Sequence, residues 1–322
     1  RSPLRAALRH PTLSKGGGVP PAWAGNAAYV ADFLNDRYWT GRLSTLGLAT
    51  SFSRSTVGDS IDSTGAVSQF AIDAMRKNDR GVLIEPAATN LIFQSNNFAN
   101  AQWTKGSVTV GATSGGFTQI LETATTAFHR MLKSSGGTVV NGNPYVWVWT
   151  VKKRGRRYLV DRTTVDGSVN RQVTFDLDNV SVVYQSAGRT GAIAKVGSTY
   201  ILAIAATALS TGISMGLCSS DSATSSDTIP SFLGDVAQGF DLYNLDLIDG
   251  SVGLSPIETA AAAVTRAADA LVLKLPAGSA RDLTFTFDDS TTQLVSSVSG
   301  GDYAVPTNLN RPLVTKAVWG SV

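Results

Sequence analysis

The stretch "YVWVWTVKK", residues 145–153, carries the strongest local signal for the fold. Aromatic and β-branched residues, which favour strands, fill every position up to Val151. Side chains alternate between the two faces of a strand, so three aromatic rings share one face and Val146, Val148 and Thr150 share the other. Because both faces are largely apolar, we expect a central strand that is buried on both sides, as in a β-sandwich.

Hairpin signals recur on both sides of this strand. "RQVTFDLDNVSVVYQ" (171–185) bends at Asp178-Asn179, and "LTFTFDDSTTQLVSSV" (283–298) bends around "DDST". "DSTG" (62–65) is a turn between two β-compatible runs. Strands at short spacing without a βαβ rhythm predict an all-β, antiparallel sandwich of the jelly-roll type.

The composition agrees with this fold class. Of 322 residues, 43% are hydrophobic and only 16% are charged, while Ser and Thr number 34 and 33. Such a chain is long enough for two domains and too apolar to be disordered throughout. One uncharged stretch, Thr199–Cys218, could be considered as a membrane span. Its many Ser, Thr and Gly residues make it only modestly hydrophobic, so we interpret it as one or two buried strands.

The N-terminal segment differs from the rest in charge. Residues 1–31 contain no acidic residue, and "GGGVPP" prevents a regular element there. We expect an extended basic arm over residues 1–27 that anchors the chain to an acidic partner. The rest of the chain is nearly neutral and does not resemble a nucleic-acid binder. The candidate anchoring residues are Arg1, Arg5, Arg9 and Lys15.

Signs of enzymatic chemistry are scarce. Cys218 is the only cysteine, and His10 and His129 are the only histidines, so neither a disulfide nor a cysteine-based zinc site is expected. We predict no cofactor, no metal and no catalytic residue, because no hydrolase, metalloprotease or phosphate-binding motif occurs. His129 has no Ser or Asp companion in its local sequence.

Paired carboxylates keep one enzymatic alternative open. A glycosidase needs two carboxylates facing each other about 5–10 Å apart across a cleft. Each candidate pair also lies at a predicted hairpin or strand end, where Asp is a common turn residue. The pairs are Asp176/Asp178, Asp246/Asp249 and Asp288/Asp289.

A basic run and one tryptophan are candidate contacts for a glycan or a partner. The run "KKRGRR" (152–157) is predicted to be a hairpin turn, with "YLVDRTT" (158–164) as the returning strand. It either contacts an anionic partner or is a solvated turn whose charges discourage edge aggregation. Trp103 lies in a polar context and could stack on a sugar ring. The candidate cations are Lys152, Lys153, Arg154, Arg156 and Arg157.

The segment "GVLIEPAATNLIFQSNNFANAQWTKGSVTV" (81–110) resembles one found in tailed-phage virion proteins. "AAVTRAAD" (262–269) is similar to that family's exit from a carbohydrate-binding-module-like sandwich, and the order of motifs extends the resemblance over about 29–320. One departure is "YNLDL", where relatives often have "WGAQL". The matching residues of the first segment are Gly81, Ile84, Glu85, Thr89, Asn90, Leu91, Trp103 and Thr104.

The resemblance implies a non-enzymatic structural protein of the phage particle: a fibre, spike or decoration protein of head or tail. It would lie on the outer surface, contact capsid or tail proteins, form a homo-oligomer (a trimer is favoured) and contribute to host-glycan adhesion. We expect no nucleic-acid partner and no membrane span. Alternatives are a glycan-cleaving tailspike and a free polysaccharide-binding module of a secreted bacterial protein. The expected parts are the arm (1–27), a β-hairpin region leading into the sandwich (28–84), the sandwich (85–268) and a small C-terminal β-domain (269–322).

Overall fold

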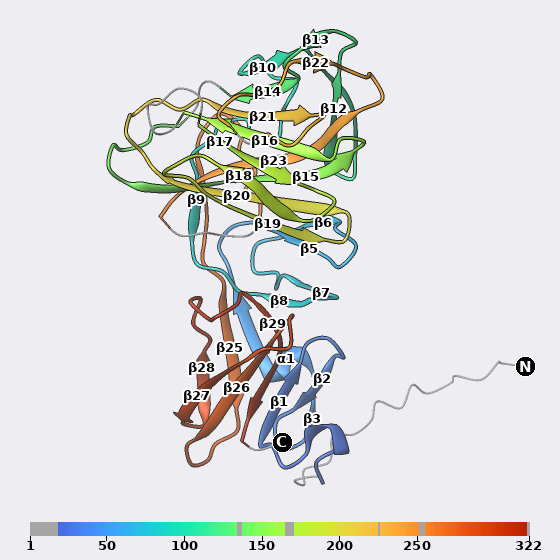
Figure 1. The fold of residues 1–322 in the computed structure, drawn as a ribbon. Helices are drawn as coiled ribbons and strands as arrows, with labels where there is room; N and C mark the ends of the chain where they lie inside the picture. The colour runs from blue at the N-terminus through green and yellow to red at the C-terminus, as the bar shows by residue number, and fades with distance from the viewer. Residues whose placement is uncertain (1–18, 134–136, 165–170, 225, 251–254, 321–322) are drawn as a thin grey trace, which may run out of the picture. The chain divides into compact units, whose positions relative to one another are not determined.

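The computed structural model describes residues 19–133, 137–164, 171–224, 226–250 and 255–320. Almost every element in these ranges is an antiparallel strand (Figure 1), which confirms the predicted all-β class. The helices there are short, η1 (Ala22–Ala24) and α1 (Leu46–Ala49). The predicted anchoring residues Arg1, Arg5, Arg9 and Lys15 lie outside the described residues.

The chain divides into two compact units. One unit combines residues 1–51 with 271–322, and the other comprises residues 52–270. This division differs from the expected four parts, because strands from the two ends of the chain share a sheet. Tyr29 in the first strand lies opposite Trp319 in the last. The C-terminal segment is therefore not a domain by itself.

The terminal unit is built on one sheet with the order β27-β26-β29-β1-β2-β3. A smaller pairing joins β25 (Ala270–Leu275) to β28 (Gly301–Ala304). The chain leaves the unit through β4 (Thr50–Ser53). The sheet strands are β1 (Tyr29–Asp32), β2 (Arg37–Trp39), β3 (Leu43–Ser44), β26 (Arg281–Phe287), β27 (Thr292–Val298) and β29 (Leu313–Trp319).

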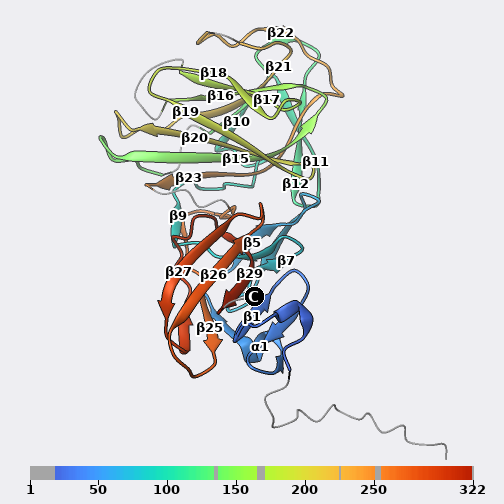
Figure 2. The same ribbon diagram turned by 60° about the horizontal axis from the view of Figure 1, so that its bottom comes forward.

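The central unit, residues 52–270, is the sandwich. One layer has the order β10-β14-β21-β16-β17-β18 and the other β11-β12-β23-β15-β20-β19, and Figure 2 shows the two layers stacked. The first layer consists of β10 (Trp103–Gly106), β14 (Arg130–Lys133), β16 (Tyr158–Thr163), β17 (Gln172–Asp176), β18 (Ser181–Gln185) and β21 (Met215–Ser220). The second consists of β11 (Val108–Ser114), β12 (Phe117–Glu122), β15 (Pro144–Arg154), β19 (Thr190–Val196), β20 (Thr199–Thr207) and β23 (Gly239–Asp249).

The strand predicted over 145–153 is β15, and it is central as expected. It pairs with β20 on one side and β23 on the other, and its residues from Tyr145 to Val151 are all buried. Trp147 and Trp149 pack in one core cluster with Leu159 and Phe175 of the facing layer. Burial of these large aromatic side chains makes this cluster a major source of the unit's stability.

The segment after β15 corrects one expectation. "YLVDRTT" does not return beside β15, because β16 belongs to the opposite layer and pairs with β17 and β21. The basic run therefore ends β15 with residues 152–154 and crosses between the layers with residues 155–157, and it is not a hairpin turn. Gly155 has φ +77°, a backbone conformation that glycine adopts readily.

The other local predictions are confirmed. The runs around Asp178-Asn179 and around "DDST" form hairpins β17–β18 and β26–β27. Thr199–Cys218 contains strand β20 and part of β21. Within the described ranges, no helix has the length and apolar character needed to cross a membrane.

Short strands on the same unit complete the fold and carry the site described next. β5 (Gly58–Ile61) and β6 (Val67–Phe70) form a hairpin, and β9 (Ala88–Asn90) pairs with β23 and β24 (Val264–Arg266). The remaining pairs are β7 (Lys77–Asn78) with β8 (Gly81–Leu83) and β13 (Thr126–Ala127) with β22 (Phe232–Leu233).

Candidate functional site

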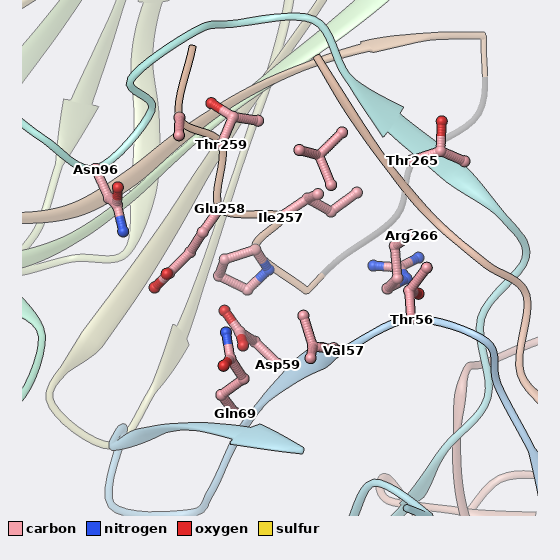
Figure 3. A pocket seen from close by; sticks show the side chains of 14 residues that line it. Thr56, Val57, Asp59, Gln69, Asn96, Ile257, Glu258, Thr259, Thr265 and Arg266 are labelled. Carbon is pink, nitrogen blue, oxygen red and sulfur yellow. The ribbon is translucent and has the colours of Figure 1, made fainter. Parts of the chain in front are cut away.

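A pocket of about 320 Å³ opens in the central unit between the β5–β6 hairpin and the segment after β23. Figure 3 shows side chains from both segments converging in it. Its lining mixes carboxyl, amide and hydroxyl groups with apolar side chains, the usual character of a ligand site. The lining residues are Thr56, Val57, Gly58, Asp59, Gln69, Asn96, Pro256, Ile257, Glu258, Thr259, Ala260, Val264, Thr265 and Arg266.

The β5–β6 hairpin places Asp59 and Gln69 opposite each other, in register. Its turn is the predicted "DSTG" sequence, in which the Asp62 carboxylate accepts N–H groups from Thr64 (3.0 Å) and Ala66 (2.9 Å). Gly65 has φ +86°, and a Cβ there would lie 2.5 Å from the Val196 carbonyl oxygen. Only glycine allows the turn to approach the β19–β20 connection so closely.

Asn90, from the sequence "TNL" (89–91), stabilises the opposite wall of the pocket. The buried amide of Asn90 donates to the carbonyls of Leu245 (3.0 Å) and Ile257 (2.8 Å) and to the Asp246 carboxyl (2.9 Å). Asp246 in turn accepts the backbone N–H of Ile257 at 3.0 Å. Burial raises the pKa of Asp246 to about 8. These contacts fix the backbone that presents Glu258.

Two carboxyl groups meet at the Tyr243 hydroxyl. That oxygen lies 2.8 Å from Glu258 Oε1 and 3.2 Å from Asp59 Oδ2. A hydroxyl has one proton, so it can donate to only one of the two. Asp59 is 2% exposed, and its Oδ1 has no hydrogen-bond partner among the described residues. Burial, followed by the charge of Glu258, raises the pKa of Asp59 to about 7.

An ion network lies beside the pocket. We use this name for Arg54, Arg76, Glu85, Arg266 and Asp269, all of which are buried. Its carboxylates are well supplied with donors: Glu85 lies 2.7 Å from Arg76 and 3.1 Å from Arg266, and Asp269 pairs with Arg54 at 3.1 Å and also with Arg76.

The same network joins the two motifs that carry the phage resemblance. Glu85 comes from "LIEP", and Arg266 and Asp269 come from "AAVTRAAD". Burial alone would raise the pKa of Glu85, but Arg266 and Arg76 outweigh it and hold that pKa at about 2. These motif residues therefore hold distant segments of the unit together through buried ion pairs.

Trp103 is in the core, not at the surface. Its side chain is 1% exposed, it packs edge-to-face on Phe98, and its Nε1 donates to the Gln94 carbonyl at 2.8 Å. A ring that stacks on sugar must present a face to solvent. The expected sugar platform is therefore absent at this position.

The basic run is largely neutralised within the chain. Arg154 pairs with Asp241 (2.6 Å), Arg156 with Glu122 (2.7 Å) and Arg157 with Asp176 (2.6 Å). Lys153 pairs with Asp178, and Lys152 lies 4.1 Å from the centre of the Phe117 ring. The five cations link strands of both layers, and none of them lines the pocket.

The remaining titratable candidates have structural partners. The His129 ring is buried between the carbonyls of Ser107 (2.7 Å) and Phe232 (3.2 Å). The Cys218 thiol is buried, which raises its pKa to about 12. None of the three sequence-predicted carboxylate pairs lines the pocket.

No local sequence pattern indicates the pocket residues. Asp59 and Tyr243 are 184 residues apart, and Glu258 lies 15 residues beyond Tyr243. Within the described ranges, no group of three or more His, Cys, Asp or Glu side chains is arranged to hold a metal ion. No protein-family model and no curated protein matches the chain.

Proposed function

We propose that this chain is a non-enzymatic structural protein of a phage particle whose pocket binds a host-surface glycan. The observation that carries the glycan proposal is the pocket itself. Sugar rings combine many hydroxyl groups with apolar C–H faces, and the lining offers groups for both. Asp59, Glu258 and Gln69 supply polar contacts, while Pro256 and Ile257 supply apolar surface.

The volume of the pocket favours binding of a single sugar unit of a polymer. About 320 Å³ lies at the lower end of the range of ligand sites, about 300–1,000 Å³. A fibre or decoration protein on the particle surface would multiply such weak contacts through many copies. The assignment to a phage particle is supported by the motif order across residues 29–320.

The carboxyl geometry argues against the tailspike alternative. A glycosidase places its two carboxyl groups on either side of the bond to be cleaved. Here Asp59 and Glu258 both contact the Tyr243 hydroxyl, so the phenol occupies the space between them. A sugar can bind above this group, but the pair as placed cannot flank a glycosidic bond.

Binding of the full chain to purified host polysaccharide tests the glycan proposal. Polymer length is followed in the same samples, at low and high salt. We expect saturable binding to intact polymer, with about tenfold weaker binding by Glu258→Gln because a charge-assisted hydrogen bond is lost. Asp221→Asn is the control, since Asp221 is exposed and outside the pocket. Shortened polymer, or equal binding by both variants, would contradict this function.

Localisation needs a separate experiment. Antibodies against the full chain are expected to label the outside of intact phage particles in electron micrographs. Antibodies against an unrelated internal protein are the control. Intact particles that carry no label, while the chain is found only in the culture medium, would favour a free polysaccharide-binding module instead.

A further inference from the structure

Most buried carboxylates in the central unit are supplied with donors. Asp161 Oδ1 accepts indole N–H groups from Trp147 at 3.0 Å and Trp149 at 2.8 Å, and the Thr163 hydroxyl at 2.9 Å. Its Oδ2 has no hydrogen-bond partner among the described residues but lies 3.9 Å from a cation, Arg189 Nη1. Glu85 has two arginine partners. Such pairing is the rule, because a buried charge without partners is costly.

The pocket carboxyl groups, those of buried Asp59 and half-buried Glu258, lack such a paired cation among the described residues. Asp59 and Glu258 share one tyrosine hydroxyl, and within the described ranges no cation is ion-paired to either of them. Gln69 lies opposite Asp59 on the β5–β6 hairpin, and Oδ1 of Asp59 has no hydrogen-bond partner in that part of the chain. Figure 3 shows the carboxyl groups of Asp59 and Glu258 on the same side of the pocket. The pocket thus has a surplus of acceptors and a shortage of donors.

We propose that the pocket binds a protonated amine, as carried by a glycan with unacetylated amino sugars, and that Asp59 and Glu258 accept its N–H groups. This rests on the proposed glycan-binding function and specifies its ligand. An ammonium group brings three donors and one positive charge, which match the open acceptors and the uncompensated charge.

Calcium fits this site less well. It takes about six to eight oxygen ligands, and two carboxyl groups with one amide fall short of that number. The apolar wall of Pro256 and Ile257 also suits the carbon face of a sugar ring rather than a hydrated ion. An amine attached to a sugar ring could contact the carboxyl groups with its nitrogen and the apolar wall with its ring.

The arginines near the pocket leave room for a positively charged amine beside Asp59. Arg76, the nearest cation acting on Asp59, donates to its backbone carbonyl at 2.9 Å rather than to its carboxyl, and is engaged by Glu85 and Asp269. Arg266 lines the far side of the pocket but is held by Glu85 at 3.1 Å. Neither of these arginines neutralises the Asp59–Glu258 pair.

The test uses two probes of equal length and linkage: a β-1,4-linked glucosamine pentamer and its fully N-acetylated form. Calorimetry with the full chain at pH 7, close to the pKa of Asp59, is expected to show at least tenfold tighter binding of the amine form. Acetylation removes the charge and two of the three donors, so the acetylated form should bind weakly. Addition of a calcium chelator should leave both affinities unchanged.

Variants connect the effect to the pocket. Asp59→Asn and Glu258→Gln should each weaken binding of the amine form about tenfold, while Asp221→Asn should not. Unfolding curves of the same samples establish that the variants are folded. A further readout is the ratio of the two affinities, which should fall toward one in Glu258→Gln even if total binding is reduced.

The outcomes separate the two proposals. Equal affinity for the two pentamers, loss of binding with the chelator, or no binding of either pentamer would overturn the amine proposal. Binding of the host polysaccharide in those cases would leave the glycan proposal standing. If the host polysaccharide is not bound either, both proposals fail.

Discussion

The ion network and the pocket are neighbouring regions whose carboxylates have different numbers of hydrogen-bond donors. In the ion network, Glu85 and Asp269 are each contacted by two arginines. In the pocket, Asp59 and Glu258 share a single hydroxyl proton. Arg266 belongs to both regions, since it pairs with Glu85 and also lines the pocket. The two regions are therefore made of similar residue types with different ratios of donors to acceptors.

This difference distinguishes structural from functional ionic groups. A saturated network holds segments together and has no open hydrogen-bonding capacity for a ligand. A cluster with surplus acceptors is unfavourable by itself and becomes favourable when a donor binds. Removal of residues should thus destabilise the first region, whereas in the second it should impair binding more than folding.

The largest expected effect comes from Arg76→Met. It removes the shared partner of Glu85 and Asp269 and leaves both charges buried, so the free energy of unfolding should fall by about 3–5 kcal/mol. Denaturant unfolding of the full chain measures this. Lys274→Met is the control and should cost much less, because Lys274 and its partner Asp302 are both exposed, at 36% and 67%. Equal losses in the two variants would contradict the structural role of the ion network.

The second effect is a dependence of stability on pH. The pKa values of Asp59, about 7, and Asp246, about 8, exceed their ordinary value. Between pH 4 and these values the folded state holds protons that the unfolded state has released, so stability should fall as pH rises. We expect each of the two groups to contribute a loss of about 2 kcal/mol from pH 5 to pH 7, or about 4 kcal/mol together. The measurement is denaturant unfolding at both pH values, and a gain in stability over this range would show that these carboxyl groups are not buried as described.

Asp59→Asn tests the pocket in the same way as Arg76→Met tests the ion network. At pH 8 it removes a buried charge that lacks a cation, so the central unit should be as stable as the original or more stable, by about 1 kcal/mol. This corresponds to a rise in Tm of about 2–4 °C by calorimetry. Its loss with pH between 5 and 7 should also be smaller than in the original chain. A fall in Tm of more than 5 °C at pH 8 would instead show that Asp59 stabilises the fold, as the residues of the ion network do.

The smallest effect is expected at the basic run. Replacement of Lys153, Arg154 and Arg157 by Gln should leave both the affinity for host polysaccharide and its salt dependence unchanged, because these cations are already paired within the chain. Weaker binding with a flatter salt dependence would instead show that the basic run contacts the glycan. Glu258→Gln, measured in parallel, provides the positive control for loss of binding.

Local patterns predicted much of the fold. Alternation and residue type identified β15, and turn residues identified the β5–β6, β17–β18 and β26–β27 hairpins, because these depend on neighbours in the chain. The partner of a strand is decided by packing over long distances. Hence the prediction of a hairpin turn at the basic run is wrong, and the sequence does not indicate that β1 pairs with β29.

The site was less accessible to sequence reasoning for the same reason. Asp59, Tyr243 and Glu258 come from separate segments that meet only in the folded unit. The polar neighbours of Trp103 in the sequence predict an exposed ring that could stack on a sugar, but the ring is buried in the core. The motif residues Glu85 and Asn90, in contrast, mark the framework around the pocket rather than the pocket itself.

The most direct test of the central claim is a crystal structure of the full chain with a bound oligosaccharide of the host polysaccharide. We predict that one sugar unit occupies the pocket, with donors on Asp59 Oδ1 and Glu258 and with a carbon face on Pro256 and Ile257. A sugar bound only elsewhere, for example against the basic run, would contradict the assignment of this pocket as the binding site.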